Sequence, residues 1–184
     1  VSIGYRALRY NVTGDYNIAI GAEAGQGSSG NSHSYNVSIG YQSAKITTGA
    51  ANTSLGYQTL LRQTTGANNL AVGIQSGDLI VDGESNTLLG SYTGRTITTG
   101  DNNVIIGKSA DVSAAAGTNQ IVIGQGATGT GNNETVIGNS SQTSVLFGGD
   151  ALISGSAKST GSFGQLKAGK ISVLDESRFD SAYL

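Results

Sequence analysis

A five-residue phrase that ends in glycine returns along most of this chain at a nearly constant spacing. It reads Asn-Ile-Ala-Ile-Gly at 17–21, Asn-Val-Ser-Ile-Gly at 36–40 and Asn-Val-Ile-Ile-Gly at 103–107. The glycines that end the ten copies are separated by 17, 19, 16, 17, 17, 17, 17, 14 and 10 residues. A unit this short cannot bury a core of its own, so successive units must stack on one another. The spacing therefore predicts a solenoid.

The residues one and three positions before each of the first nine glycines are aliphatic or threonine, as in Ile18 and Ile20 or Val104 and Ile106. Period-two spacing with β-branched side chains is typical of a strand that places both positions on one face. A glycine directly after the strand suits a sharp corner. These corner glycines are Gly21, Gly40, Gly56, Gly73, Gly90, Gly107, Gly124 and Gly138.

The position between the two aliphatic residues is never charged. It is small in the first half of the chain, as in Ala19 and Ser38, and large and apolar in the second half. A strand without charge on either face is expected to be buried on both faces. We expect identical chains to pack on this second face around a symmetry axis. The candidate trimer-interface residues are Leu88, Ile105, Val122, Val136 and Leu146.

Asparagine recurs four residues before the glycine, and a further glycine often precedes this asparagine by three residues. Glycine followed by asparagine is typical of turns, and stacked asparagines would form an amide ladder at a spacing of ~4.8 Å. Small residues recur three positions after the corner glycine, where we expect limited space. The return loops carry charges and should face water. The asparagines are Asn17, Asn36, Asn52, Asn69, Asn86 and Asn103.

The composition excludes several classes of protein. The 184 residues include 29 glycines and no cysteine, so disulfides and thiolate metal sites are excluded. Lys and Arg number 10 against 12 Asp and Glu, which argues against nucleic acid as a partner. No apolar run approaches the ~18–20 residues that span a bilayer, so no membrane insertion is expected. Because Val1 lies within a repeat, we interpret the chain as a piece of a longer polypeptide.

The repeated phrase Asn-x-x-(Ile/Leu/Val)-Gly-x-x-(Ala/Ser/Thr) resembles the head repeats of trimeric autotransporter adhesins. It is closer to the longer version, Asn-Thr-Ala-Ile-Gly-Tyr-x-Ala-Leu, of bacteriophage tail-fibre proteins, and the resemblance covers about residues 1–148. It implies an all-β fold, a left-handed parallel β-roll or β-solenoid of ~17-residue repeats, with three chains around one axis in an extracellular fibre. It also implies that the aliphatic residues before the glycine form the structural core of the roll, which maps onto Ile18, Ile20, Val37, Ile39, Leu70, Val72, Val104, Ile106, Ile121 and Ile123.

The repeat pattern fades after residue 148. We expect residues 149–184 to be a connector to a downstream fibre segment or to a C-terminal chaperone domain. The stretch 159–166 resembles passages that follow such repeats in tail fibres.

No set of residues indicates an enzyme, and no cofactor or metal is expected. His33 is the only histidine, lies in the longest loop, and is interpreted as a solvated residue without ligand partners. Four tyrosines lie near the corner, and we interpret them as packing residues, with glycan or protein contact as the alternative. They are Tyr5, Tyr41, Tyr57 and Tyr92.

The sequence therefore predicts a structural segment of an extracellular trimeric fibre, and a phage tail fibre involved in host attachment fits best. Its expected partners are two further copies of itself, other virion tail proteins and, through other fibre segments, a host-cell receptor or glycan. The alternative is the head of a bacterial trimeric autotransporter adhesin on the cell surface. The longer repeat favours the phage-type fibre.

Overall fold

The computed structural model describes residues 1–142 and 145. One compact unit covers Val1–Val145. Within the described residues the chain forms nine strands and no helix, so the all-β prediction is confirmed. The strands are β1 (Ser2–Ile3), β2 (Ile18–Ile20), β3 (Val37–Ile39), β4 (Thr53–Leu55), β5 (Leu70–Val72), β6 (Thr87–Leu89), β7 (Val104–Ile106), β8 (Ile121–Ile123) and β9 (Thr135–Ile137). The connector expected at 149–184 lies outside the described residues.

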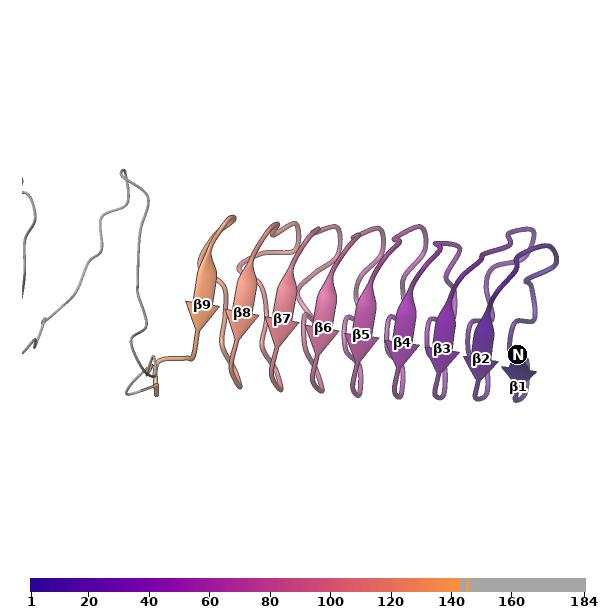
Figure 1. Ribbon diagram of the computed structural model, residues 1–184, viewed down its shortest axis with the longest axis horizontal. Coiled ribbons are helices and arrows are strands. Elements are labelled where there is room, and N and C mark those ends of the chain that lie inside the picture. Colours follow the sequence, from indigo (N-terminus) through magenta and orange to yellow (C-terminus); the bar gives the residue numbers. More distant parts are fainter. Residues whose placement is uncertain (143–144, 146–184) are drawn as a thin grey trace, which may run out of the picture. The chain divides into compact units, whose positions relative to one another are not determined.

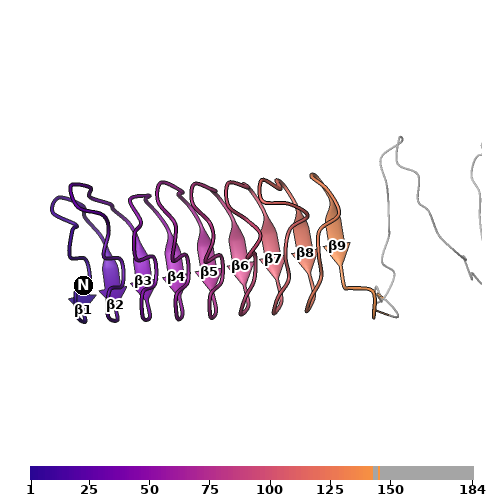
Figure 2. The same ribbon diagram turned by 180° about the vertical axis from the view of Figure 1, so that it is seen from behind.

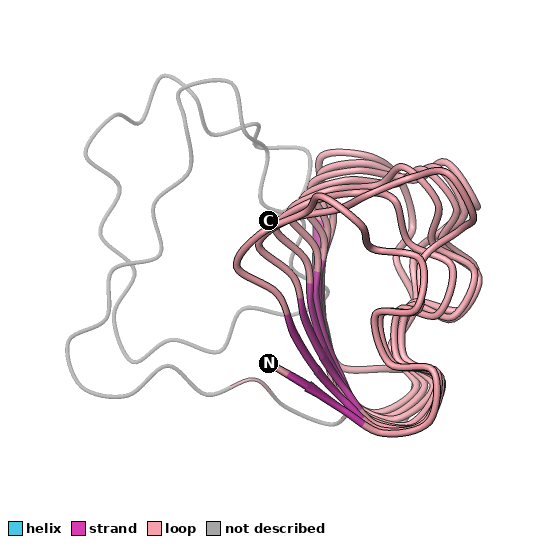
Figure 3. Ribbon diagram, turned by 90° about the vertical axis from the view of Figure 1, so that its right-hand side faces the viewer, coloured by secondary structure: helices cyan, strands magenta, loops and turns pink. Residues whose placement is uncertain are grey.

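The nine strands form one parallel sheet in chain order, with each strand beside its immediate sequence neighbours (Figure 1). The same stack is seen from behind in Figure 2. Viewed along the stack, the strands form one wall of a coil and the loops form the rest (Figure 3). The register pairs equivalent repeat positions, for example Ala19 with Ser38 and Ile105 with Val122. The chain is therefore a parallel β-solenoid, as the spacing predicts.

The predicted asparagine ladder is present and buried. In the middle of the stack, Asn86 Oδ1 accepts a hydrogen bond from the Asn103 backbone amide at 3.1 Å, and Asn86 Nδ2 donates to the Gly100 carbonyl at 2.8 Å. Asn103 Nδ2 also donates to Asn86 Oδ1 at 2.9 Å. Gln120 continues the ladder, since its backbone amide donates to Asn103 Oδ1 at 3.0 Å. The ladder ties each coil to the next inside a space that excludes water.

Two rows of glycine allow neighbouring coils to approach closely. The corner glycine Gly56 has φ 140°, and a Cβ there would lie 2.3 Å from the Gly73 carbonyl oxygen. In the second row, a Cβ on Gly49 would lie 1.8 Å from the Gly66 carbonyl oxygen, and Gly49 has no positive φ. Close approach therefore requires glycine in the second row, whereas the sequence pattern predicted turn chemistry. The residue just before each asparagine adopts the left-handed conformation instead, as in Asn68 at φ 59°.

The predicted orientation of the strands is wrong. In β7, Ile105 is fully buried inside the coil, while Val104 and Ile106 on either side are only partly buried on the outer face. Three residues per strand leave room for one inward side chain, the middle one, because the coil is narrow. The residues assigned to the core therefore lie on the outer face: Ile18, Ile20, Val37, Ile39, Leu70, Val72, Val104, Ile106, Ile121 and Ile123.

The proposed trimer-interface residues consequently have another role. Leu88, Ile105 and Val122 are fully buried within their own chain and pack in one hydrophobic cluster, against which Val136 packs. They cannot contact another subunit in this arrangement. Leu146 lies outside the described residues.

Around Leu88, side chains on opposite walls of the coil are matched in size. Where the middle strand residue is Leu88, the residue facing it from the turn is glycine, since a Cβ on Gly77 would lie 2.6 Å from Leu88 Cδ1. A Cβ on Gly94 would lie 2.8 Å from Leu88 Cδ2. In earlier coils the middle residue is small, and the position equivalent to Gly77 holds the buried Ala44 or Leu60. A dense interior needs such matched pairs.

His33 is buried, with 3% of its surface exposed, so its assignment as a solvated residue is wrong. Its Nε2 lies 3.1 Å from the Gly25 carbonyl oxygen, and its Nδ1 lies 3.0 Å from Asn36 Nδ2. Because amide Nδ2 can only donate, Nδ1 accepts and Nε2 carries the proton. The longest loop thus folds inward, and its histidine joins the asparagine ladder as a neutral ring.

Candidate functional site

The outer face of the sheet is the most unusual surface of the described chain. Each strand from β2 to β9 presents two outward side chains, and every one of them is isoleucine, leucine, valine or threonine. Several are more than one-third exposed, including Ile18 at 37%, Leu55 at 44% and Ile137 at 48%. A continuous apolar surface of this kind on a soluble protein marks an interaction site.

The parallel register turns the outward side chains into two continuous rows. One row passes through Ile39, Leu55 and Val72, which are paired in successive strands. The other row passes through Val37 and Thr53, and it continues in the same way. Neighbouring strands lie ~4.8 Å apart, so side chains within a row touch one another. The face is therefore two parallel ridges of branched side chains without a charge between them.

A tyrosine follows the corner glycine in the first, third and fourth coils. Tyr41 and Tyr57, each just after a corner glycine, stack with ring centroids 5.5 Å apart and an interplanar angle of 18°. The predicted tyrosine row is incomplete, because Tyr92 lies one position later in its coil and has the Arg95 guanidinium 5.8 Å from its ring centroid. Tyr5, in the first coil, has the Arg6 guanidinium 4.7 Å from its ring centroid.

A second stacked pair was missed from the sequence. Tyr16 and Tyr35 stack at 5.2 Å with an angle of 10°, and their exposed fractions are 77% and 61%. Each occupies the position directly before an asparagine of the ladder. That shared position in consecutive repeats is the signal that could have found the pair.

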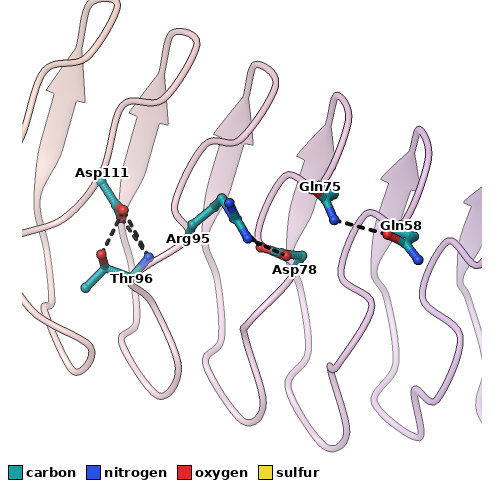
Figure 4. Close-up of polar contacts among 6 residues, drawn as sticks. All are labelled: Gln58, Gln75, Asp78, Arg95, Thr96 and Asp111. Carbon is teal, nitrogen blue, oxygen red and sulfur yellow. Dashed lines mark hydrogen bonds and ion pairs between the residues drawn. The ribbon is translucent and has the colours of Figure 1, made fainter.

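The turn segments carry polar ladders (Figure 4). Gln75 Nε2 donates to Gln58 Oε1 at 3.1 Å. The same side-chain hydrogen bond joins Gln58 to Gln42 in the preceding pair of coils. Further along, Arg95 Nε donates to Asp78 Oδ1 at 3.1 Å, and the side-chain hydrogen bond and charge of this carboxylate raise the pKa of Arg95. These contacts join neighbouring coils through their side chains.

Two acidic side chains also take part in contacts between neighbouring coils. The pKa of Glu23 lies below its usual range because its carboxylate accepts a hydrogen bond from Gln42 and pairs with Lys45 at 2.9 Å. Hydrogen bonds from Thr65 and Thr64 lower the pKa of Asp82. A general acid at neutral pH needs the opposite shift, so neither carboxylate resembles one.

The described residues also hold no arrangement suited to a metal. Among them, no three His, Cys, Asp or Glu side chains lie together. A hollow of about 430 Å³ beside β9 is lined by Gly126, Thr128, Val136, Ile137, Gly138, Asn139 and Ser140, none of which is titratable. Across residues 1–142 and 145, no helix has the length and apolar character needed to cross a membrane.

The structure thus leaves the outer face as the candidate site, in an orientation opposite to the one expected. The rows assigned to the core, such as Ile18 and Ile20, form the exposed surface. Comparison with protein-family models, with curated proteins and with solved structures found no match.

Proposed function

We propose that this chain is a structural segment of an extracellular trimeric fibre, most consistent with a phage tail fibre that takes part in host attachment. Two further copies of the chain cover its outer face. The segment acts as a spacer, and receptor contact falls to other parts of the fibre. No catalytic role is proposed for any residue.

The observation that carries this proposal is the uncharged outer face of the sheet. Outward rows of Ile, Leu, Val and Thr, partly or fully exposed, run from β2 to β9 without a single Lys, Arg, Asp or Glu. Leaving such a surface in water forfeits roughly 25 cal/mol for each Å² of apolar area. Contact with another apolar surface is therefore favoured, and that surface must match the strand spacing along the whole sheet.

A second copy of the same chain supplies this match. Its strands repeat at the same ~4.8 Å, so ridges of one copy can lie in the grooves of another with their axes parallel. The face has two rows, one passing through Ile39 and the other through Val37. If each row meets a different neighbour, every chain contacts two others, as a closed threefold arrangement requires.

The interior supports a mechanical role. Neighbouring coils are joined by strand hydrogen bonds, by the asparagine ladder and by side-chain ladders in the turns. Each coil contacts only its neighbours, so added repeats lengthen the rod at ~4.8 Å per coil without a change of design. Such a rod can hold a distal tip away from a particle.

Immunogold electron microscopy tests the proposed setting. An antibody raised against the full 184-residue chain should label fibres of tailed particles released from the source culture. Antibody pre-absorbed with the purified chain is the control and should lose the label. Labelling confined to intact bacterial cell surfaces, with unlabelled particles, would contradict the phage assignment and favour the adhesin alternative.

A further inference from the structure

Two further rows of residues border the outer face of the sheet, one at each end of the strands. The leading flank consists of the residue two positions before each ladder asparagine or its equivalent, and the trailing flank consists of the residue directly after each corner glycine. On the leading flank, the Asn102 amide donates to the Glu84 carbonyl at 3.0 Å. On the trailing flank, the Ser109 amide donates to the Ser91 carbonyl at 3.0 Å. Equivalent hydrogen bonds join neighbouring coils, so both flanks are continuous rows.

Beside β3, β4 and β5 the trailing flank is large and apolar, whereas the leading flank is small. Tyr41, Tyr57 and Ile74 on the trailing flank are exposed by 46%, 48% and 45%. Exposed side chains of this size favour contact with another surface. Small residues at the other end of the same strands leave room for such contact. The leading-flank residues beside these strands are Ser34, Ala50 and Ala67.

Beside β7 the two flanks carry opposite charges. Lys108 on the trailing flank is exposed, and its side chain makes no ion pair among the described residues. Asp101 on the leading flank accepts a hydrogen bond from the Glu84 amide through Oδ1 at 2.7 Å, and Oδ2 has no partner in the same part of the chain. Seven residues of largely extended backbone, roughly 20 Å, separate Asp101 from Lys108, so the two cannot pair within one chain.

The flanks beside β6, β8 and β9 are polar at both ends of each strand. The second coil departs from this agreement, since Asp15 and Ala22 lie at the two ends of β2. From β3 onward, the two ends of each strand carry residues that suit contact with one another. The polar pairs are Glu84 with Ser91, Thr118 with Gln125 and Asn132 with Asn139.

A closed threefold arrangement of parallel chains brings the two flanks of the same coil together. Rotation about an axis parallel to the stack leaves every coil at its own height. If each aliphatic row meets a different neighbour, the trailing flank of one chain lies beside the leading flank of the next. A shift of one coil in one direction would place Ile74 against Glu84. The opposite shift would place Tyr41 against Asp15, so either shift brings an apolar side chain to a carboxylate.

We propose that neighbouring copies of this chain pack in parallel without an axial shift, and that Lys108 of each copy pairs with Asp101 of the next. Tyr41, Tyr57 and Ile74 of one copy pack on the small leading flank of its neighbour. The ion pair sets the register, because sliding the copies would separate the charges. This inference rests on the proposed function, which places copies of the chain on the outer face, and it adds the contacts that align them.

Cysteine cross-linking tests the register, since the chain has no cysteine of its own. Asp101→Cys and Lys108→Cys are made in separate full chains, co-expressed, and treated with a short bis-maleimide, so a link between the two variants must join different chains. We expect a two-chain band on denaturing electrophoresis for the mixture and none for either variant alone. Lys108→Cys co-expressed with Ser34→Cys is the control. These positions lie four coils apart, ~19 Å along the stack, and should link only if copies are antiparallel or shifted.

Charge reversal tests the ion pair itself. Lys108→Glu should raise the concentration at which the assembly dissociates in sedimentation equilibrium by at least about threefold. Adding Asp101→Lys should restore it to within about twofold. Lys108→Glu with Asp15→Lys has the same net charge, but the two sites lie five coils apart, ~24 Å, so this variant should stay as weak as Lys108→Glu.

The failures of the two proposals can be told apart. A trimeric mass without the link between residues 101 and 108 would overturn the register and leave the trimer standing. Equal rescue by Asp15→Lys and Asp101→Lys would overturn the ion pair in the same way. A single-chain mass for the unmodified protein would overturn both the register and the proposed function.

Discussion

The early and late coils of this solenoid share one frame but fill it differently. In β2 to β4 the inward residue of the strand is small: Ala19, Ser38 and Ser54. In β6 to β8 it is large and apolar: Leu88, Ile105 and Val122. Register, corner glycines and asparagine ladder are the same in both regions.

The early coils compensate with polar contacts and with larger groups from the opposite wall. Ser43 Oγ donates to Ser54 Oγ at 2.7 Å, and the His33 ring fills space beside Asn36. The late coils use aliphatic packing, with Ile97 and Val112 in the same cluster as Leu88. The frame thus sets the size of the coil, and the interior can be filled by either chemistry if the volume is conserved.

The largest expected effect comes from a charge in the late interior. Ile105→Asp would bury an unpaired carboxylate in the aliphatic cluster, and we expect it to cost more than about 4 kcal/mol of unfolding free energy. Circular dichroism during thermal melting measures this loss. The control is Ile106→Asp, one residue away on the outer face, which should keep the strand signal of the single chain. Equal unfolding by both variants would contradict the orientation of the strand.

The next effect tests volume matching across the coil. Gly77→Ala places a methyl group 2.6 Å from Leu88 Cδ1 at a residue with φ 61°, and we expect a cost of about 2–3 kcal/mol. Leu88→Ala alone should cost about 2–5 kcal/mol through the cavity it leaves. The double variant should be more stable than the sum predicts, by at least about 1 kcal/mol, because it copies the early coils.

Urea unfolding of these three proteins gives the coupling energy. Gly131→Ala is a suitable control, because the nearest atom is the flexible Glu134 side chain at 3.3 Å and Gly131 has no positive φ. Additive free energies in the double variant would show that the two walls do not compensate.

A smaller effect depends on pH and belongs to the early coils alone. Burial lowers the pKa of His33, so the unfolded chain takes up a proton before the folded chain does. The stability due to the neutral ring is complete above about pH 6.5 and declines as the pH falls from there toward the lower pKa of the folded state. Urea midpoints at pH 7.5 and 5.0 measure the decline.

The variant His33→Gln removes the titrating group and should reduce this pH dependence. The late coils have no histidine. Amide protection factors, which correct for the slower intrinsic exchange at low pH, should therefore fall near Asn36 before they fall near Asn103. An unchanged dependence in the glutamine variant would assign the pH effect to another group.

The smallest effect is expected on the return loops. Arg62 is exposed, and Arg62→Ala should change the unfolding free energy by less than about 0.5 kcal/mol in either direction. Urea unfolding measures it beside the interior variants. A loss above about 1 kcal/mol would mean that the loops contribute to the frame.

The sequence predicts the backbone arrangement of this solenoid well, but it predicts poorly which side chains fill the interior. Strand positions, parallel register and the asparagine ladder follow from the spacing, because one repeat must hydrogen bond to the next. The residues Val104, Ile105 and Ile106 do not indicate which side chains point into the coil, because all three are aliphatic. The ladder asparagine did carry the information. Asn103 and Ile105 are two residues apart, so they share a face, and both are buried.

The candidate site could be predicted only in part. The aliphatic rows are visible in the sequence, but their exposure depends on how narrow the coil is. The Asp78 and Arg95 pair and the burial of His33 depend on where loops of unequal length fold, which repeat spacing does not determine.

We propose above that copies of this chain cover the outer aliphatic rows of the sheet. Sedimentation equilibrium of the full chain at submicromolar concentration tests it most directly. We expect a mass of three times the 18.5 kDa of one chain, and a smaller mass for Ile106→Asp at the same concentration. A well-folded, unmodified chain that sediments as a single 18.5 kDa species would contradict it.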